Sequence, residues 1–458
     1  MKKEIKKILC VNCSLFVLFS AISCSNVSGK ASEEEENSTV LRSVDSKVKK
    51  GKTLKVGKDQ KYKTINDALK SAKNGDVIEV YDGEYKETLS VKKSVEIIGK
   101  GNVKINAEGM AVNDDVDIIN VSARNVTLSD LDIYGLKANK EGCHPCGIRV
   151  EEGSDNISIL NCKIHDIGYT YPSSGKDEDA DYNAHGIWIG SQKTSDREIK
   201  GVHINNCELY NLKVGNSEVL VLNGNVSGFG IVNNYIHDCD NIGIDIIGYE
   251  EGNYSESNRA RAGIIQNNVI KNISSETNYT YDDCCAGGIY VDGGFDVEIS
   301  NNLIINCDIG IELASEHKGY TTDGITVFNN FIYNEAENCW AGISIGGDDE
   351  DDNGETKDCH IANNTVYCYK GSSFVVQKAN DERNIIERNV FIFGDDGEAV
   401  EYSEYEHFDN THNTFRDNTE LDVSDGYVQA VTLNENTKSI EITPETLIAE
   451  GRGAVKFN

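Results

Sequence analysis

The stretch Asn301-Asn302-Leu303-Ile304-Ile305-Asn306 shows the pattern that decides the fold, because related segments recur along most of the chain. Each copy begins at a polar corner, in most copies an asparagine pair, and continues as a short strand. Successive copies start between 25 and 45 residues apart. The other copies begin at Asn161, Asn206, Asn233, Asn267, Asn329, Asn363 and Arg388. Variable spacing around a short minimum is typical of a solenoid whose turns keep their strands and change their loops.

A second recurring strand, of the form Gly-Ile-x-apolar, lies between these segments. Its copies begin at Gly147, Gly186, Gly243, Gly288, Gly310 and Gly342. Each turn therefore carries at least two short strands. Period-two alternation and β-branched residues favour a parallel β-helix, in which each turn pairs with the next at about 4.8 Å.

Asparagines at one corner of successive turns can satisfy the backbone groups that a bend leaves bare. We expect a column of such residues to pair side chain to side chain along the stack. Its members are Asn234, Asn268, Asn302, Asn330 and Asn364. This column is interpreted as structural.

The N-terminal end of the repeats predicts a cap. Residues Thr64–Ala72 open with a helix N-cap residue, and Ile65, Leu69 and Ala72 share one helical face, so a short helix should close the end of the core. Several stretches here resemble the opening of the pectate-lyase-like right-handed β-helix superfamily. They are Tyr62–Leu69, Asn74–Val80, Gly83–Glu87 and Val95–Gly99. The resemblance extends through the repeats over roughly residues 52 to 430. It implies an all-β, right-handed parallel β-helix, but it does not select among lyases, hydrolases, epimerases and phage tail fibres.

The composition limits the partners. The 458 residues include 76 Asp and Glu against 44 Lys and Arg, a formal net charge of −32. This charge argues against general nucleic-acid binding and against docking on anionic membrane surfaces. A polyanionic substrate would be repelled unless a cation bridged it to the protein.

The first residues predict export. Met1–Lys7 is basic, and Ile8–Ile22 is a mostly apolar run too short for a comfortable membrane span. Ala21-Ile22-Ser23-Cys24 resembles a bacterial lipoprotein processing box, so Cys24 is the expected lipidation site; an ordinary cleaved signal is the alternative. We therefore expect a cell-surface or periplasm-facing lipoprotein, a monomer that meets the membrane only through its lipid. Its predicted parts are a signal peptide (1–24), a flexible tether (25–50), the β-helix (51–430) and a C-terminal capping segment (431–458).

Eleven cysteines follow Cys24, and their pattern favours a structural role over a catalytic one. Cys143 and Cys146 form a single C-x-x-C with no second pair at zinc-site spacing. Cys162 and Cys207 fall at the same place in the repeat. They are interpreted as stacked core thiols or as one disulfide bridge.

The Gly-Ile-x-apolar strands also predict a candidate site, because the residue between two inward apolar side chains points outward. The outward column contains Arg149, Trp188, a residue of the Val221–Asn225 turn whose register stays open, Asp245, Tyr290, Glu312 and Ser344. Asp245 and Glu312 should lie two turns apart, about 9.6 Å between backbones. Asp292 projects from the Tyr290 strand, two residues further on.

This constellation suits the paired carboxylates of glycoside hydrolases, which lie about 6.5–9.5 Å apart in inverting enzymes and about 5–5.5 Å apart in retaining ones. We assign Glu312 as the general acid, Asp245 or Asp292 as the base or nucleophile, and Tyr290 as an orienting hydroxyl. The alternative is a solvated acidic face on an acidic protein. Hydrolysis of this kind requires no cofactor.

Aromatic residues near the column suggest sugar contacts. Trp188 is assigned as a sugar platform, with Arg149 beside it in the column. The insertion Tyr169–Asn183 contributes Tyr171 to a possible aromatic wall. The same aromatics could instead pack the insertion onto the stack.

Two other functions stay open. Beside Glu312, the segment containing Glu316, His317 and Lys318 could supply the base of a polysaccharide lyase, a class that commonly uses Ca²⁺. Asp349, Asp351 and Asn353 resemble the first half of a calcium loop, although the carboxylate that should close the loop is missing. The third possibility is a noncatalytic glycan-binding protein or adhesin. The sequence as a whole favours an exported, polysaccharide-active protein.

Overall fold

The computed structural model is a right-handed parallel β-helix. It describes residues 51–173, 175–190, 197–250, 252, 254–349, 351–377, 381–394, 397–403, 413–423, 431–434, 439–442 and 453–454. The expected signal peptide, Cys24 and tether lie outside these residues, as does much of the segment 431–458. Within the described part of the chain, no helix is both long and apolar enough to cross a bilayer.

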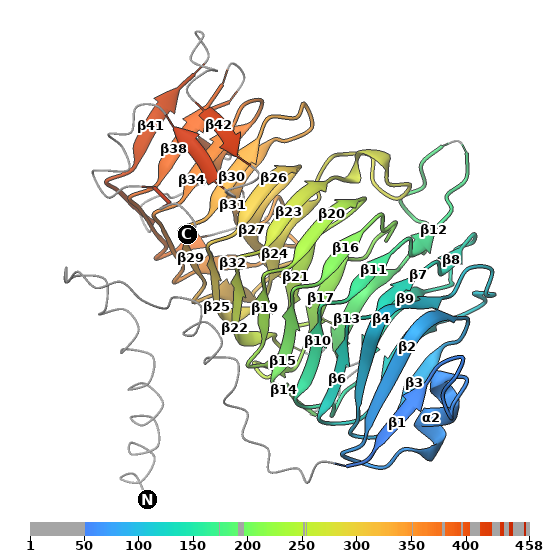
Figure 1. Cartoon of the computed structure of the whole chain (residues 1–458). Helices are drawn as coiled ribbons and strands as arrows, with labels where there is room; N and C mark the ends of the chain where they lie inside the picture. The colour runs from blue at the N-terminus through green and yellow to red at the C-terminus, as the bar shows by residue number, and fades with distance from the viewer. Residues whose placement is uncertain are drawn as a thin grey trace, which may run out of the picture. The chain divides into compact units, whose positions relative to one another are not determined.

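Strands follow one another along the stack in chain order, from β1 (Thr53–Val56) to β41 (Thr419–Asp422), as Figure 1 shows. The Gly-Ile strands form one parallel sheet, called here the site sheet. Its described strands are β3 (Leu89–Val91), β5 (Val116–Val121), β9 (Pro145–Val150), β13 (His185–Gly190), β17 (Leu220–Asn223), β21 (Ile244–Ile247), β24 (Gly287–Asp292), β27 (Ile309–Ala314), β31 (Ala341–Ile345), β35 (Ser372–Val376) and β39 (Val400–Tyr402). The predicted second strand of each turn is thus confirmed.

The strands that follow the asparagine corners belong to a second, larger parallel sheet. Examples are β20 (Tyr235–Cys239), β23 (Val269–Ile273), β26 (Leu303–Cys307), β30 (Phe331–Asn334) and β34 (Thr365–Cys368). Near the C-terminus, β42 (Val431–Asn434) and β43 (Ser439–Ile442) pair antiparallel.

The core lies between the sheets and repeats with the turns. The isoleucines of the Gly-Ile strands point inward and are fully buried: Ile148, Ile187, Ile244, Ile289, Ile311 and Ile343. A strand alternates its side chains between faces, so the residue after each isoleucine faces away from this core. The packing of the core therefore determines which residues the outer face displays.

The asparagine column is a hydrogen-bonded ladder, as predicted. The Nδ2 of Asn268 donates to the Oδ1 of Asn302 at 3.0 Å, and the Nδ2 of Asn302 donates to the Oδ1 of Asn330 at 3.0 Å. The ladder runs through Asn234, Asn268, Asn302, Asn330, Asn364, Asn389 and Asn418. The residue before each rung turns the corner in the left-handed region, at φ 56° for Asn301, which asparagine tolerates better than most residues.

The predicted capping helix is confirmed. Helix α2 (Ile65–Ser71) buries Ile65, Ala68 and Leu69, and the side chain of Thr64 accepts a hydrogen bond from the Asp67 N–H at 3.1 Å. Cys162 and Cys207 are buried free thiols, which matches the stacked-thiol interpretation and not the bridge.

Candidate functional site

The outward column of the site sheet has the predicted register. Asp245 on β21 pairs with Tyr290 on β24, and Tyr290 pairs with Glu312 on β27. The column continues to Ser344 in one direction and through Val221 and Trp188 to Arg149 in the other. Val221 therefore fills the turn that the sequence left open.

A cleft of about 870 Å³ opens over the middle of this column. The sheet side contributes Tyr290 and Glu312, and Glu316 follows β27. The remaining walls come from loops before β24, before and after β31, and after β35. They include Tyr281, Asp283, Cys284, Cys285, Glu337, Trp340, Asp348, Asn353 and Gln377. The described residues that line the cleft include five carboxylates and no lysine, arginine or histidine.

Glu312 is the half-buried carboxylate at the base of the cleft. Its Oε1 accepts a hydrogen bond from the Nε2 of Gln377 at 3.0 Å, and the same nitrogen donates to the Ser344 hydroxyl at 2.9 Å. Burial, assisted by the negative charge of Glu316, raises the pKa of Glu312 to about 8. Glu312 is therefore largely protonated at neutral pH and can donate a proton within the cleft.

Asp245 and Asp292 do not line the cleft, which differs from the sequence-based expectation. Each is only 2% exposed. The Oδ1 of Asp292 accepts the Glu316 N–H at 2.7 Å. Burial raises the pKa of both carboxyls well above its usual range, and neighbouring carboxylates add to the effect. The expected groove between Asp245 and Glu312 is thus replaced by a cleft over Glu312 with two acids beneath its surface.

The predicted sugar contacts are also covered. Trp188 and Arg149 are each 6% exposed, and the Arg149 guanidinium lies 4.6 Å from the centre of the Trp188 ring. The Nε of Arg149 pairs with Asp117 at 2.7 Å. The indole therefore presents no open face to a sugar, and the assignment of Trp188 as a platform is corrected on that ground.

Tyr171 packs its insertion onto the stack. Its hydroxyl donates to the Oδ2 of Asp240 at 2.6 Å, and its ring lies in an aromatic cluster with Tyr169, Tyr182 and Tyr279. This is the packing alternative for the Tyr169–Asn183 insertion, and it removes Tyr171 from the cleft.

The residues considered for a lyase have other partners. The Nε2 of His317 lies 3.3 Å from the Oε1 of Glu250, and the Nζ of Lys318 lies 3.2 Å from Asp351. The interaction with Glu250 raises the pKa of His317, which favours its protonated form. Neither residue lines the cleft.

In the segment that resembles half of a calcium loop, side-chain oxygens accept hydrogen bonds from backbone N–H groups of the same segment. The Oδ1 of Asp349 accepts the Asp351 N–H at 2.8 Å, and the Oδ1 of Asn353 accepts the Asp349 N–H at 2.9 Å. Asp349 and Asp351 are exposed. Calcium binding at these three residues stays a prediction.

The sequence reasoning missed several residues of the cleft. Trp340, whose Nε1 donates to the Cys284 carbonyl at 2.9 Å, directly precedes β31 and is one of only two tryptophans in the chain. Gln377 follows β35, a strand that lacks the Gly-Ile signature. Asp348 lies in the loop after β31, where the repeat pattern gives no register.

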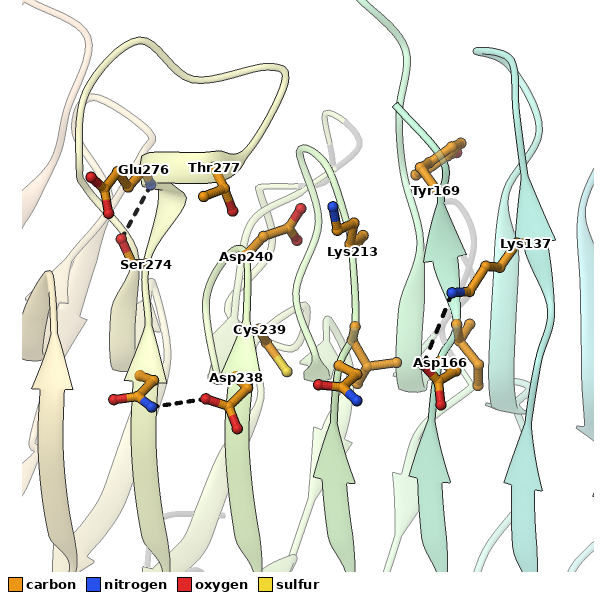
Figure 2. A pocket seen from close by; sticks show the side chains of 14 residues that line it. Lys137, Asp166, Tyr169, Lys213, Asp238, Cys239, Asp240, Ser274, Glu276 and Thr277 are labelled. Atoms are coloured by element: carbon orange, nitrogen blue, oxygen red, sulfur yellow. Dashed lines mark hydrogen bonds and ion pairs between the residues drawn. The ribbon is translucent and has the colours of Figure 1, made fainter. Parts of the chain in front are cut away.

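A second hollow, of about 380 Å³, lies elsewhere on the stack (Figure 2), and three of the acids that line it, Asp166, Asp238 and Asp240, have polar partners. Asp166 pairs with Lys137 at 3.9 Å, and Asp238 accepts a hydrogen bond from Asn272 at 2.8 Å. Asp240 accepts bonds from the Val214 N–H and the Tyr171 hydroxyl. Among the described residues of the Glu312 cleft, Glu337 pairs with Lys370 at 3.8 Å, whereas Glu312 is bonded to the neutral amide of Gln377.

Solved structures share the fold. A GH136 lacto-N-biosidase from Eubacterium ramulus superposes with a TM-score of 0.55 at 12% identity, covering 81% of this chain and 68% of the enzyme. A rhamnogalacturonan lyase superposes with a TM-score of 0.51 at 13% identity, covering 88% of this chain and 99% of the lyase. At these identities the likeness establishes the fold alone, a parallel β-helix.

Sequence comparison gives the family. No family model matches the chain. The uncharacterized protein YwoF of Bacillus subtilis (strain 168) is 33% identical over 384 residues, covering 80% of this chain and 78% of YwoF. An alignment of this identity and coverage indicates common descent. The chain therefore belongs to the YwoF family.

Proposed function

We propose that the protein hydrolyses glycosidic bonds of a polysaccharide or oligosaccharide in the Glu312 cleft. The observation that carries the proposal is a half-buried carboxyl, Glu312, whose pKa burial raises to about 8, in an open cleft lined by further carboxylates. Glycoside hydrolysis needs a carboxylic acid to protonate the leaving oxygen and a carboxylate as the base or nucleophile.

In this proposal Glu312 donates its proton to the glycosidic oxygen as the bond to the anomeric carbon breaks. Asp348 lies in the same cleft, and its negative charge contributes to the raised pKa of Glu312. It is the second carboxylate and replaces the buried Asp245 and Asp292 in that role. The carboxyl separation in the glycan complex decides the stereochemistry, at about 5–5.5 Å for retention and about 6.5–9.5 Å for inversion.

The cleft suits an uncharged glycan. The carboxylates that line it besides the protonated Glu312 would repel a polyuronate, and no basic side chain among its described lining residues could hold a uronate group. Trp340 and Tyr281 provide aromatic surface for sugar rings. Two proteins of the same fold are named for carbohydrate chemistry, which supports polysaccharide processing in general.

The alternative is a calcium-dependent lyase. It would need a free base beside the substrate, whereas His317 pairs with Glu250 and Lys318 pairs with Asp351. These contacts favour hydrolysis over elimination.

The test is a panel of neutral and acidic glycans incubated with the full chain, with and without Ca²⁺. Released reducing ends and ultraviolet-absorbing unsaturated ends are both followed. We expect reducing ends without unsaturated ends, and a loss of at least about 100-fold in Glu312→Gln and Asp348→Asn. The control Asp349→Asn changes the neighbouring exposed acid and should keep full activity.

Unsaturated ends would support the lyase and overturn hydrolysis. Glycan binding without any product, in the parent and in all variants, would support the noncatalytic adhesin.

We also propose that the protein is exported and anchored through a lipid on Cys24, working as a monomer on extracellular or periplasmic glycan. The support is the basic and apolar start and the Ala21–Cys24 motif. Labelled fatty acid supplied to cells should be incorporated into the parent chain and not into Cys24→Ala. Equal labelling of both chains would overturn the anchor.

A further inference from the structure

Three carboxylates meet beside the cleft from separate stretches of the chain. Glu250 follows β21, Asp292 ends β24 and Glu316 follows β27, so all three stand at the same end of successive strands of the site sheet. One oxygen from each lies within 4.8 Å of the other two. The stacking of the turns produces this convergence.

A fourth carboxylate, Asp245, lies close enough to Asp292 and Glu316 to feel their negative charges. Asp245 is 2% exposed, and its Oδ1 has no hydrogen-bond partner among the described residues. Asp245 lies on β21 and pairs with Tyr290 on β24, and Tyr290 precedes Asp292 by two residues. Asp245 therefore points out of the core on the same face of the sheet as Asp292. A buried carboxylate oxygen without a partner is costly unless a ligand satisfies it.

His317 pairs with one member of the cluster, Glu250, and the other three carboxylates have no basic partner among the described residues. No lysine, arginine or histidine in the described part of the chain forms an ion pair with Asp245, Asp292 or Glu316. Arg259 is held by Asp323 at 3.0 Å and by the carbonyls of Gly293 and Gly294. The cluster is therefore short of positive charge.

We propose that Glu250, Asp292 and Glu316 bind a hard divalent cation, with Ca²⁺ the best fit, and that Asp245 completes the site. Carboxylate oxygens are the preferred ligands of Ca²⁺, which binds them at about 2.3–2.6 Å. Two ligands on opposite sides of the ion would then lie about 5 Å apart, which is compatible with three oxygens that all lie within 4.8 Å of one another. The Oδ1 of Asp292 accepts the Glu316 N–H, and its second oxygen can serve the ion.

Such an ion would tie the loops after β21 and β27 to the strand end at β24. Glu316 lines the cleft, so the ion would fix one wall of it. The site is distinct from the Asp349–Asn353 loop. It does not rest on the proposed hydrolysis, since it concerns binding and stability and assigns no catalytic step to the ion.

The test is calorimetric titration of the chelator-treated full chain with CaCl₂, and separately with MgCl₂, together with thermal melts. We expect saturable binding of one Ca²⁺, a higher Tm with Ca²⁺, and weaker binding of Mg²⁺. Asp292→Asn and Glu250→Gln should each lower the Ca²⁺ affinity at least tenfold. Asp114→Asn changes an exposed acid that belongs to neither candidate site, and as the matched control it should bind as the parent does; Asp349→Asn and Asp351→Asn test the loop as the alternative site.

Absence of binding by the folded parent at millimolar Ca²⁺ would overturn the site, since the carboxyls would then be satisfied by protons alone. Binding abolished by the loop variants but kept by Asp292→Asn and Glu250→Gln would also overturn it and move the ion to residues 349–353. Circular dichroism establishes that each variant is folded. If Asp292→Asn does not fold, the affinity of Glu250→Gln, which changes a more exposed residue, decides between the two outcomes.

Discussion

Replacing Asn302 with alanine should destabilise the β-helix strongly, because this side chain sits in the middle of the ladder with no solvent exposure. Its Oδ1 accepts the backbone N–H of Asn268 at 2.9 Å and the Nδ2 of Asn268 at 3.0 Å. Its Nδ2 donates to the Ile265 carbonyl at 2.9 Å and to the Oδ1 of Asn330 at 3.0 Å. The substitution therefore removes four hydrogen bonds at once.

The magnitude follows from these bonds. Each internal hydrogen bond contributes about 0.5–1.5 kcal/mol net, so four give about 2–6 kcal/mol. The Asn268 N–H and the Ile265 carbonyl would stay buried with no replacement partner, which places the expected loss toward the upper half of that range. Alanine at the exposed Asn102 is the control, with an expected change within about 0.5 kcal/mol.

Urea unfolding followed by circular dichroism measures both variants. The ladder would be refuted as a source of stability if Asn302→Ala lowered the free energy of unfolding by less than about 1 kcal/mol while the slope of that free energy against urea concentration stayed the same. A repeat protein can unfold in stages, so the slope is compared before any free energy is extracted.

Three further predictions concern the site. Glu312 must keep its proton to act as an acid, so kcat/KM should fall as the pH rises through about 8; a constant rate up to pH 10 would contradict its role. Burial, assisted by the nearby charges of Glu316 and Glu250, raises the pKa of Glu218 from 4.5 to about 8, so between these pH values the folded state holds a proton that the unfolded state releases. In chelator the Tm should therefore decline over this range, and less steeply in Glu218→Gln; parallel curves would contradict this. Trp340→Ala should raise KM about tenfold with little change in kcat, as loss of one aromatic contact predicts, whereas an unchanged KM would remove Trp340 from the glycan contacts.

The repeat made the fold predictable in detail. Each asparagine corner and each Gly-Ile strand marks the same place in a turn, so their alignment gives the register of distant residues. The pairing of Asp245 with Tyr290 and of Tyr290 with Glu312 follows from that alignment. The cap at Thr64 was predictable because a helix N-cap depends on local residues.

The site was less predictable because loops decide which parts of the column meet solvent. The register places Asp245, Trp188 and Glu312 on one outer face, but it does not say that the first two are buried there. The loops that contain Trp340 and Asp348, and the segment before β24, vary in length from turn to turn and carry no repeat. Only the folded structure therefore shows that they lie over Glu312. The proximity of Glu250 to Asp292 could not be predicted for the same reason, because Glu250 lies in the loop after β21.

The central claim is that Glu312 protonates a glycosidic oxygen while water completes the cleavage. The most direct measurement is mass spectrometry of products formed from a cleaved glycan in water enriched in heavy oxygen. Hydrolysis predicts one heavy oxygen at each newly formed reducing end and none with Glu312→Gln. Products without the label that carry an unsaturated sugar end, or labelled products formed equally by Glu312→Gln, would contradict the account.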